Sequence, residues 1–349
     1  MSQCLIDMKK FILFSVLLFI GVLTTQAYPK LVATNDDAAT EFPRQKHLVE
    51  LFTSQGCLYC PLGEEVLELV SQKPELSEKI AWASLHINVT VSDIFCTSKT
   101  STICTDLGAT SFPSATFNRK DYTGNGKLPI VVSAISENIP IMAQELSQML
   151  MGDTTPCLAN IKLDATYDET TRMLKVDVLG QTASNFIATY GNNVGLTVYL
   201  TEDSLVARQL SPEGTWISDY VHNHVVREVL SSIKGDMVTI TNGIYQKSFT
   251  KTLKETWNVN NIHVIAFLHR KGSTATTREV INCEMIDLRD LLAVKGDING
   301  DGKVDIAEVN AIINMMLGKA DAVPAADLNT DGNVDISDVN AVINLMLGK

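Results

Sequence analysis

The chain has 349 residues, a length that predicts two or three domains. Its residues are 45% hydrophobic and 19% charged, and this composition argues against a mainly disordered chain. Its formal net charge of -12 argues against nucleic acid as a partner, because binding a phosphate backbone needs a basic face. Nine Asp and Glu but only three Lys lie between Asp297 and Lys349, so these last 53 residues carry half of the excess charge.

The N-terminus has the pattern of a secretory signal. Lys9 and Lys10 precede the apolar run FILFSVLLFIGVL, and the small residues TTQA follow it. We therefore expect a signal peptide over residues 1–27 and a flexible leader over 28–45. A transmembrane anchor is the alternative, but the apolar run is short and a glycine interrupts it. The mature chain is thus expected to be exported without such an anchor, to the periplasm, the outer membrane surface or the exterior.

Residues 46–155 alternate between strand and helix patterns, which predicts a mostly parallel or mixed sheet with helices on its faces. Apolar runs predict strands, and apolar residues at helical spacing predict helices. The expected strands cover 47–52, 79–89, 114–118 and 128–132, and the expected helices cover 61–72 and 134–152.

Within this segment, Cys57 and Cys60 stand between the first strand and the first helix, the layout of a thioredoxin-like redox motif. A helix N-terminus favours a thiolate, so Cys57 is the candidate attacking group, and Cys60 is placed to resolve a mixed disulfide. Phe112–Pro113 resembles the cis-proline segment that faces this motif in thioredoxin-like proteins. The resemblance implies a thioredoxin-like fold and a role for Pro113 in holding a polypeptide client. A structural disulfide that never exchanges remains the alternative.

Past the signal peptide the chain carries six cysteines, and disulfides are common in exported proteins. Spacing suggests Cys57–Cys60 and Cys96–Cys104 as local pairs, which leaves Cys157 and Cys283. Sequence alone does not decide among the possible connectivities.

Residues 156–290 carry about seven short alternating runs separated by turn residues, which predicts an antiparallel β-sandwich domain. The segment 220–233 is ambiguous between strand and helix. Its His222 and His224 have a spacing that suits zinc, but a third ligand is not apparent, so a hydrogen-bonded cluster is favoured.

Residues 291–349 contain an internal repeat: DINGDGKVDIAEVNAIINMMLGK at 297–319 returns as DLNTDGNVDISDVNAVINLMLGK at 327–349. Each copy fits the calcium-loop pattern with oxygen ligands at alternating positions, followed by an amphipathic helix. We therefore expect two calcium ions. The expected ligands are Asp297, Asn299, Asp301, Lys303 through its carbonyl, Asp305 and Glu308, then Asp327, Asn329, Asp331, Asn333, Asp335 and Asp338.

A loop–helix duplicate of this kind closely resembles the dockerin family. The resemblance implies calcium-dependent folding and docking onto a cohesin-type receptor. It also associates the chain with polysaccharide-degrading assemblies, because dockerins usually belong to their components.

Three stretches together, LFTSQGCLYCPLGEE, LTVYLTED and YVHNHVVRE, look like the outer-membrane-protein-related family named for its twenty-eight-kilodalton founding member. This resemblance implies a thioredoxin-like domain joined to a β-sandwich at the cell envelope.

Three functions are compatible with these patterns. The favoured hypothesis is an exported cell-envelope binding or scaffold protein, tethered to a cohesin-type receptor by a calcium-dependent dockerin. The first alternative is an exported thiol–disulfide oxidoreductase or isomerase that uses Cys57 and Cys60. The second is an accessory component of a polysaccharide-degrading assembly. Whether the chain is an enzyme stays open at this point.

Overall fold

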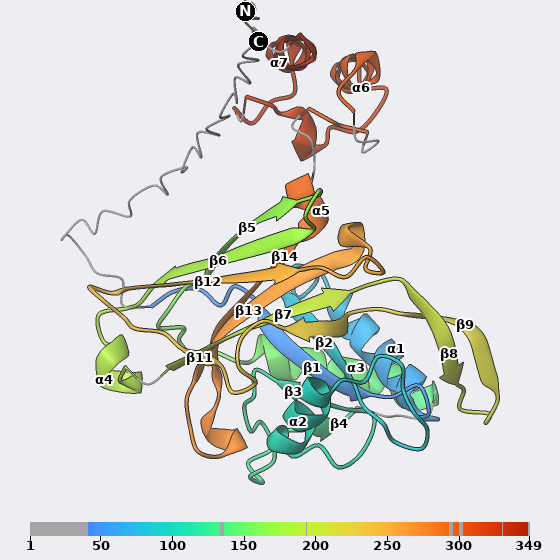
Figure 1. Cartoon of the computed structure of the whole chain (residues 1–349), viewed down its shortest axis with the longest axis vertical. Helices are drawn as coiled ribbons and strands as arrows, with labels where there is room; N and C mark the ends of the chain where they lie inside the picture. The colour runs from blue at the N-terminus through green and yellow to red at the C-terminus, as the bar shows by residue number, and fades with distance from the viewer. Residues whose placement is uncertain are drawn as a thin grey trace, which may run out of the picture. The chain divides into compact units, whose positions relative to one another are not determined.

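The computed structural model describes residues 41–132, 136–192, 194–292, 296–299, 303–329 and 331–347 (Figure 1). The expected signal peptide and residues 28–40 of the expected leader lie outside these residues. Among the helices that are described, none has the length and the apolar character needed to cross a membrane. The fold is mostly β, with helices packed on a large mixed sheet and a separate small helical module at the C-terminal end of the chain.

The first segment of the chain builds one half of the large sheet. Strand β1 pairs in parallel with β2 and antiparallel with β3, and β4 adds to β3. Both faces of β1 are buried, which explains why its apolar run does not alternate. The elements are β1 (His47–Thr53), α1 (Cys60–Ser71), β2 (Ile80–His86), α2 (Ser98–Leu107), β3 (Ser114–Phe117), β4 (Ile130–Val131) and α3 (Ile139–Met151).

The same sheet continues into the second segment of the chain. Strand β10 pairs in parallel with β2 through Val225 and Ser84, and β7, β13 and β14 follow in antiparallel order. The nine-stranded sheet therefore crosses the boundary expected near residue 155. The added strands are β7 (Val194–Glu202), β10 (Val225–Val229), β11 (Asp236–Met237), β13 (Ile262–Arg270) and β14 (Val280–Asp287).

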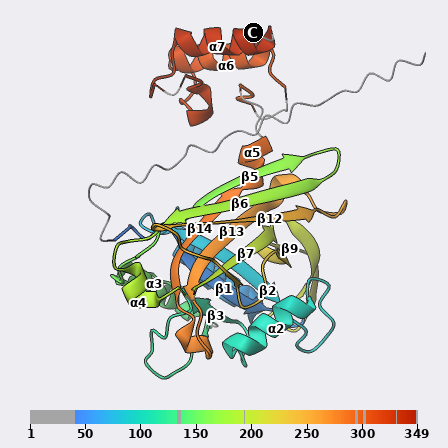
Figure 2. The same cartoon turned by 60° about the vertical axis from the view of Figure 1, so that its left-hand side comes forward.

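A second sheet of three strands packs on the β7–β13–β14 half, as Figure 2 shows. Its strands alternate between buried and exposed residues because one face meets the core and the other meets solvent. The strands are β5 (Lys162–Asp168), β6 (Met173–Gln181) and β12 (Ile244–Thr252). Helices α1 and α3 cover the β1–β3 half of the large sheet, where Val49 and Leu51 enter their core.

A buried ion pair joins the two halves of the large sheet on its other face. Arg119 donates two hydrogen bonds to the Glu50 carboxylate, at 2.8 and 2.6 Å. The Tyr199 hydroxyl, from β7, donates to the same carboxylate at 2.9 Å, and Thr116 donates at 2.9 Å. Burial alone would raise the pKa of Glu50, but the Arg119 charge and these hydrogen bonds hold it below its usual value. The ion pair therefore ties β1 to a strand about 150 residues later in the chain.

One hairpin stands outside both sheets. Strands β8 (Leu205–Leu210) and β9 (Trp216–His222) pair only with each other among the described strands, and they lie between β7 and β10 in the chain. The segment 220–233, ambiguous in the sequence, is thus the end of β9 followed by β10. The described part of this region also contains the short α-helices α4 (Phe186–Tyr190) and α5 (Leu288–Leu292) and the 3-10 turns η2 (Val259–Asn261) and η3 (Ala275–Thr277).

The C-terminal module has its own small core. Helices α6 (Ile306–Met316) and α7 (Ile336–Met346) contact each other through Val309, Ile312, Val339 and Val342. Each helix begins at a capping box, made by Asp305 with Glu308 and by Asp335 with Asp338. The aspartate at loop position nine therefore also starts the helix, which explains why loop and helix recur as one unit.

Candidate functional site: a covered disulfide and two calcium loops

Cys57 and Cys60 form a disulfide at the junction of β1 and α1. Helix α1 begins at Cys60 itself, so Cys57 lies three residues before the helix and Cys60 occupies its first turn. The sequence predicts this helix from residue 61, and in the structure it begins one residue earlier. Cys57 is only 7% exposed and Cys60 is fully buried, although Leu58 and Tyr59 between them are exposed. A reagent from solvent therefore meets Cys57 first.

The Phe112–Pro113 peptide bond is cis, and Pro113 lies against the first turns of α1. Gly63 makes this approach possible, because a Cβ at that position would lie 2.5 Å from Cγ of Pro113. The absence of a side chain at Gly63 thus lets the proline pack one turn after Cys60. The three residues that sequence patterns had grouped as the candidate site, Cys57, Cys60 and Pro113, lie together in one region.

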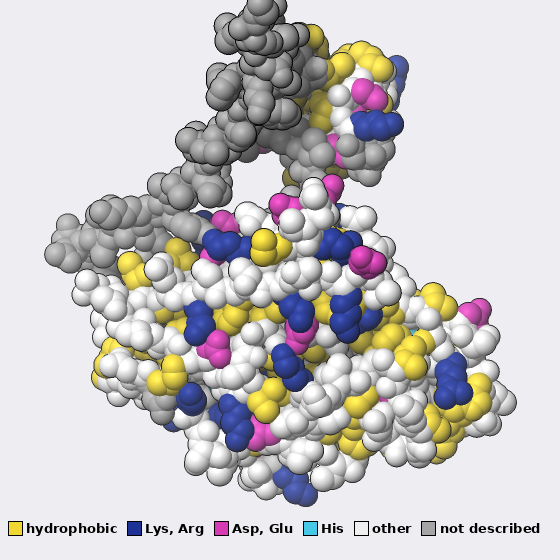
Figure 3. Space-filling model, viewed as in Figure 1, with side chains coloured by type: hydrophobic (Ala, Val, Ile, Leu, Met, Phe, Trp, Pro, Cys, Tyr) yellow, Lys and Arg dark blue, Asp and Glu magenta, His cyan; other side chains and the backbone are white. Residues whose placement is uncertain are grey.

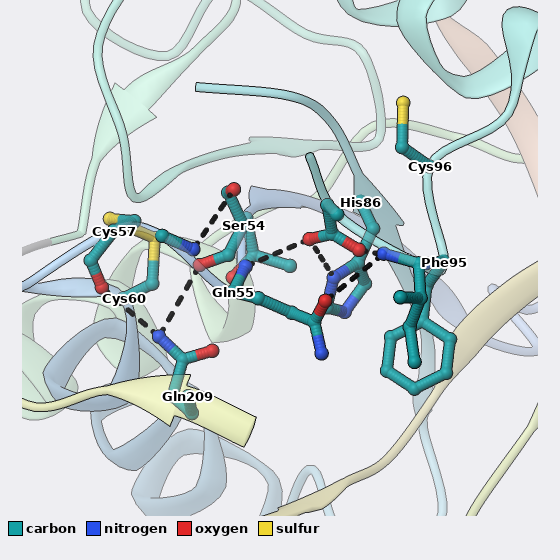
Figure 4. A network of polar contacts seen from close by, with 12 residues as sticks. Ser54, Gln55, Cys57, Cys60, His86, Phe95, Cys96 and Gln209 are labelled. Atoms are coloured by element: carbon teal, nitrogen blue, oxygen red, sulfur yellow. Dashed lines mark hydrogen bonds and ion pairs between the residues drawn. A yellow bond between two sulfur atoms is a disulfide. The ribbon is translucent and has the colours of Figure 1, made fainter. Parts of the chain in front are cut away.

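The β8–β9 hairpin covers the disulfide loop, as Figure 4 shows. The side-chain amide of Gln209 donates to the carbonyl oxygens of Cys57 and Ser54, at 3.0 and 3.3 Å. The backbone N–H of Leu210 donates to the backbone carbonyl of Gln55 at 2.9 Å. The side-chain amide of Gln55 donates to the backbone carbonyl of Arg208 at 3.0 Å. These bonds join a hairpin of the second segment to the disulfide loop of the first.

Behind the loop, a buried aspartate holds the backbone in place. Asp93 accepts hydrogen bonds from the backbone N–H groups of Gln55 and Phe95, both at 2.8 Å, and contacts Nδ1 of His86 at 2.8 Å. Burial alone would raise the pKa of Asp93, but its contact with His86 and the two N–H groups hold it below the usual value. The aspartate is therefore charged at neutral pH and fixes the shape of the loop.

The two histidines considered as zinc ligands, His222 and His224, pack against aromatic rings. His222 is buried among the rings of His86, Phe95 and Tyr220, and burial lowers its pKa to about 4. His224 stacks on Trp82, and burial lowers its pKa as well. Both imidazoles are therefore neutral at pH 7. The described residues contain no group of three or more His, Cys, Asp or Glu side chains placed to hold a metal ion.

The other cysteine pairs suggested by spacing are not bonded. Four cysteines are free thiols: Cys96, Cys104, Cys157 and Cys283. The predicted disulfide between Cys96 and Cys104 was therefore wrong, and Cys157 and Cys283 are not joined to each other either. Helix α2 explains the first case: it buries Cys104 two turns into the helix, while the thiol of Cys96 contacts the Ser101 hydroxyl at 3.3 Å. Burial raises the pKa of the Cys104 thiol to about 11, which disfavours its reactive thiolate form.

In the first calcium loop, one buried carboxylate oxygen is suited to a cation. Glu308 is fully buried; one oxygen accepts the backbone N–H of Asp305 at 2.8 Å. Its other oxygen has no hydrogen-bond partner among the described residues. A buried carboxylate oxygen is costly without a partner, so the residues fit a bound calcium ion. The expected ligand Asp301 lies outside the described residues.

In the second loop, the carboxylates contact the loop backbone. Asp338 is fully buried and accepts the N–H groups of Leu328 at 2.8 Å and Asp335 at 2.9 Å. Asp327 accepts the N–H groups of Asp331 and Gly332 at 3.1 and 2.8 Å. The loop backbone thus fixes the position of both carboxylates, whose oxygen atoms are the ligand type that calcium prefers.

Two family models match parts of the chain. The sequence model of outer membrane protein Omp28 matches residues 100–287, more than half of the chain. The chain belongs to the Omp28 family. The match begins after Cys57 and Cys60, so it covers the hairpin and the strands around it but not the disulfide itself. The dockerin type I domain matches residues 295–347 of this Omp28-family protein.

These two matches carry several conclusions. A type I dockerin domain binds calcium and implies a cohesin-type partner. An outer-membrane family together with a dockerin indicates an exported or envelope-associated protein. No curated protein matches the chain.

Among solved structures, the Omp28-family chain is similar to HBP35 of Porphyromonas gingivalis, with a TM-score of 0.57 and 20% identity over 71% of this chain and 76% of that one. This likeness concerns the fold alone. A protein from Agrobacterium tumefaciens matches with a TM-score of 0.40, 15% identity, and coverage of 70% and 95%. A domain of the outer membrane lipoprotein Omp28 from Porphyromonas gingivalis matches with a TM-score of 0.23, 21% identity, and coverage of 38% and 88%.

Sequence patterns did not identify the residues that surround the disulfide. Gln209 and Asp93 have no motif of their own, and Gln209 lies 152 residues from its partner Cys57. The sequence shows Gln209 only as a polar residue, and such residues are common in exposed strands, so it did not indicate a contact with Cys57.

Proposed function

We propose that this protein is an exported cell-envelope binding protein whose dockerin holds it on a cohesin-type receptor. The observation that supports this function most directly is the type I dockerin match over the repeated loop–helix unit. The two repeats also expose matching apolar residues: Ile306 is 62% and Ile336 58% exposed, and Leu317 is 62% and Leu347 61% exposed. Exposed apolar groups at equivalent positions suit a protein-binding surface that occurs twice.

Calcium binding supports this proposal physically. Each loop has four carboxylates, and without a cation their like charges repel one another. We propose two ions, one per loop, with Glu308 and Asp338 closing the two sites. Because each loop leads directly into α6 or α7, an ion in the loop orders the helix that carries the exposed apolar residues.

Equilibrium binding of the mature chain to purified type I cohesin modules tests this function. We expect binding in calcium and its loss after chelation. The double variant Ile313→Asp/Ile343→Asp places a charge on both helices, at residues that are each 37% exposed, and should abolish binding. Val206→Asp, at a 67% exposed site on β8, is the matched control and should bind normally. Binding that persists without calcium, or in the double variant, would contradict the proposal.

A second function, thiol–disulfide exchange, is favoured by the geometry around Cys57. The disulfide precedes a helix, and the cis peptide at Pro113 packs beside it through Gly63. The order β1–α1–β2 with antiparallel β3 and β4 and a final α3 supports our proposal of a thioredoxin-like fold for this segment.

In the proposed exchange, a client thiolate attacks Sγ of Cys57, and the Cys57–Cys60 bond breaks to leave the Cys60 thiolate. A second client thiolate then attacks the client sulfur of the mixed disulfide and releases Cys57 as a thiolate. The client loses two electrons and the cysteine pair gains them. Both cysteines are buried, but Cys57 retains 7% exposure and Cys60 none, which matches these two roles.

Redox titration of the mature chain, with thiol trapping and mass mapping of Cys57 and Cys60, tests the exchange. A reduction potential above about -270 mV would support transfer of disulfides to clients. A potential below about -300 mV would identify a structural bridge and leave the binding function as the sole role.

A further inference from the structure

A pocket of about 310 Å³ opens between helix α1 and the β8–β9 hairpin, and its wall begins at Pro61, the residue after Cys60. Its volume lies at the lower end of the range for small-ligand pockets, about 300–1,000 Å³. The walls come from both segments of the chain: α1 and β2 from the first, and β9 with the residues after it from the second. The pocket therefore exists only because the hairpin covers the disulfide loop.

The pocket is acidic, and the described residues that line it include no Lys or Arg. Glu64, Glu65 and Glu68 of α1 line it, and none of them takes part in an ion pair among the described residues. Glu64 accepts a hydrogen bond from the Tyr220 hydroxyl at 2.6 Å. Burial raises the pKa of Tyr220, and the negative charges of all three glutamates raise it further. All three glutamates thus contribute to the electrostatic potential of the same pocket.

The indole of Trp82 forms part of the pocket wall. Trp82 is only 5% exposed, and its indole N–H is buried without a hydrogen-bond partner among the described residues. His224 stacks on the indole ring with 4.4 Å between the ring centroids, and it is neutral because burial lowers its pKa. A cationic ligand would therefore meet three glutamates in this pocket and no Lys or Arg among the described lining residues.

We propose that this pocket binds a lysine or arginine side chain of an extended polypeptide, whose cation pairs with Glu65 and Glu68. The aromatic rings of Trp82 and Tyr220 flank the bound side chain. This inference goes beyond the proposed functions, since it names a recognition element of the bound partner and needs no exchange at the cysteines.

The surface next to the pocket suits the rest of such a polypeptide. Val221 lines the pocket and is 48% exposed, and Leu58 and Tyr59 beside the disulfide are 38% and 51% exposed. Trp216 and Val206 extend this apolar character along the hairpin, and Figure 3 shows apolar side chains gathered there. A polypeptide with a basic residue beside apolar ones therefore matches both the pocket and its surroundings.

Fluorescence anisotropy with the full mature chain tests the proposal. The probes are two short extended peptides without cysteine, identical except that the central residue is arginine in one and uncharged citrulline in the other. We expect the arginine peptide to bind about tenfold more tightly at low ionic strength, the size of one charge-assisted hydrogen bond. Equal affinity for the two peptides would overturn the proposal.

Variants identify the residues that carry the preference. Glu65→Gln/Glu68→Gln should remove the preference for arginine. Glu75→Gln/Glu78→Gln, which alters the same net charge at exposed positions outside the pocket, should keep it. A preference unchanged in the first pair, or lost in the second, would contradict the assignment.

One further measurement tests whether the ligand is a polypeptide. Free arginine amide that binds as tightly as the peptide would overturn the polypeptide as ligand. The redox titration decides exchange independently, because peptide binding in this pocket involves no bond to sulfur.

Discussion

The hydrogen bonds of Gln209 predict how readily the disulfide opens to solvent. The variant Gln209→Leu keeps the size of the side chain and removes its donor. The side-chain oxygen of Gln209 has no partner among the described residues, so only the amide N–H bonds are lost. The Gln209 bond to Leu210 lies within the hairpin itself. The contribution of Gln209 to holding the hairpin closed therefore comes from its bonds to Cys57 at 3.0 Å and Ser54 at 3.3 Å, and the backbone bond of Leu210 to Gln55 is unchanged in the variant.

Two such bonds contribute about 1–3 kcal/mol to closure, since each net hydrogen bond is worth about 0.5–1.5 kcal/mol. In the variant, the fraction of molecules in which the hairpin is detached from the disulfide loop should therefore rise about 5-fold to 150-fold. Cys57 and Cys60 are buried in the closed form, so reduction by dithiothreitol should accelerate by the same factor when opening is fast. The assay quenches the reaction by alkylation and counts reduced cysteines by mass.

Gln246→Leu, at an exposed position on β12, is the matched control and should be reduced at the rate of the unchanged protein. Urea unfolding of both variants excludes a general loss of stability as the cause. If Gln209→Leu were reduced no faster than the control, the hairpin would not be the barrier that protects the disulfide.

Three further predictions concern the fold and the metal. Gly63→Ala places a Cβ 2.7 Å from Cβ of Pro113, so urea unfolding should show a loss of about 1–3 kcal/mol, and unchanged stability would refute this packing. Arg119→Met leaves Glu50 charged and buried, so stability should fall by about 3–5 kcal/mol, and adding Glu50→Gln should recover most of it. Glu308→Gln should weaken calcium binding at one of the two loops, and calorimetry that still resolves two unchanged sites would contradict the assigned ligand.

The sequence by itself determined the features that depend on neighbouring residues. The calcium loops and their helices were predictable because each ligand has a fixed offset from Asp297 or Asp327, and the capping boxes follow from the same short pattern. The strands and helices of residues 46–155 followed from apolar spacing, apart from α2. Cys57 and Cys60 are close enough in the chain to meet without any tertiary information.

Only the tertiary structure decided what surrounds the disulfide. The strand β10 pairs with β2 through Val225 and Ser84, and this one parallel contact brings the second segment into the first sheet. The hairpin before β10 then reaches the disulfide loop, where it supplies Gln209 and Tyr220. Sequence periodicity reports which faces of a strand are buried but not which distant strand lies beside it. For the same reason, spacing alone paired cysteines that the folded chain keeps apart.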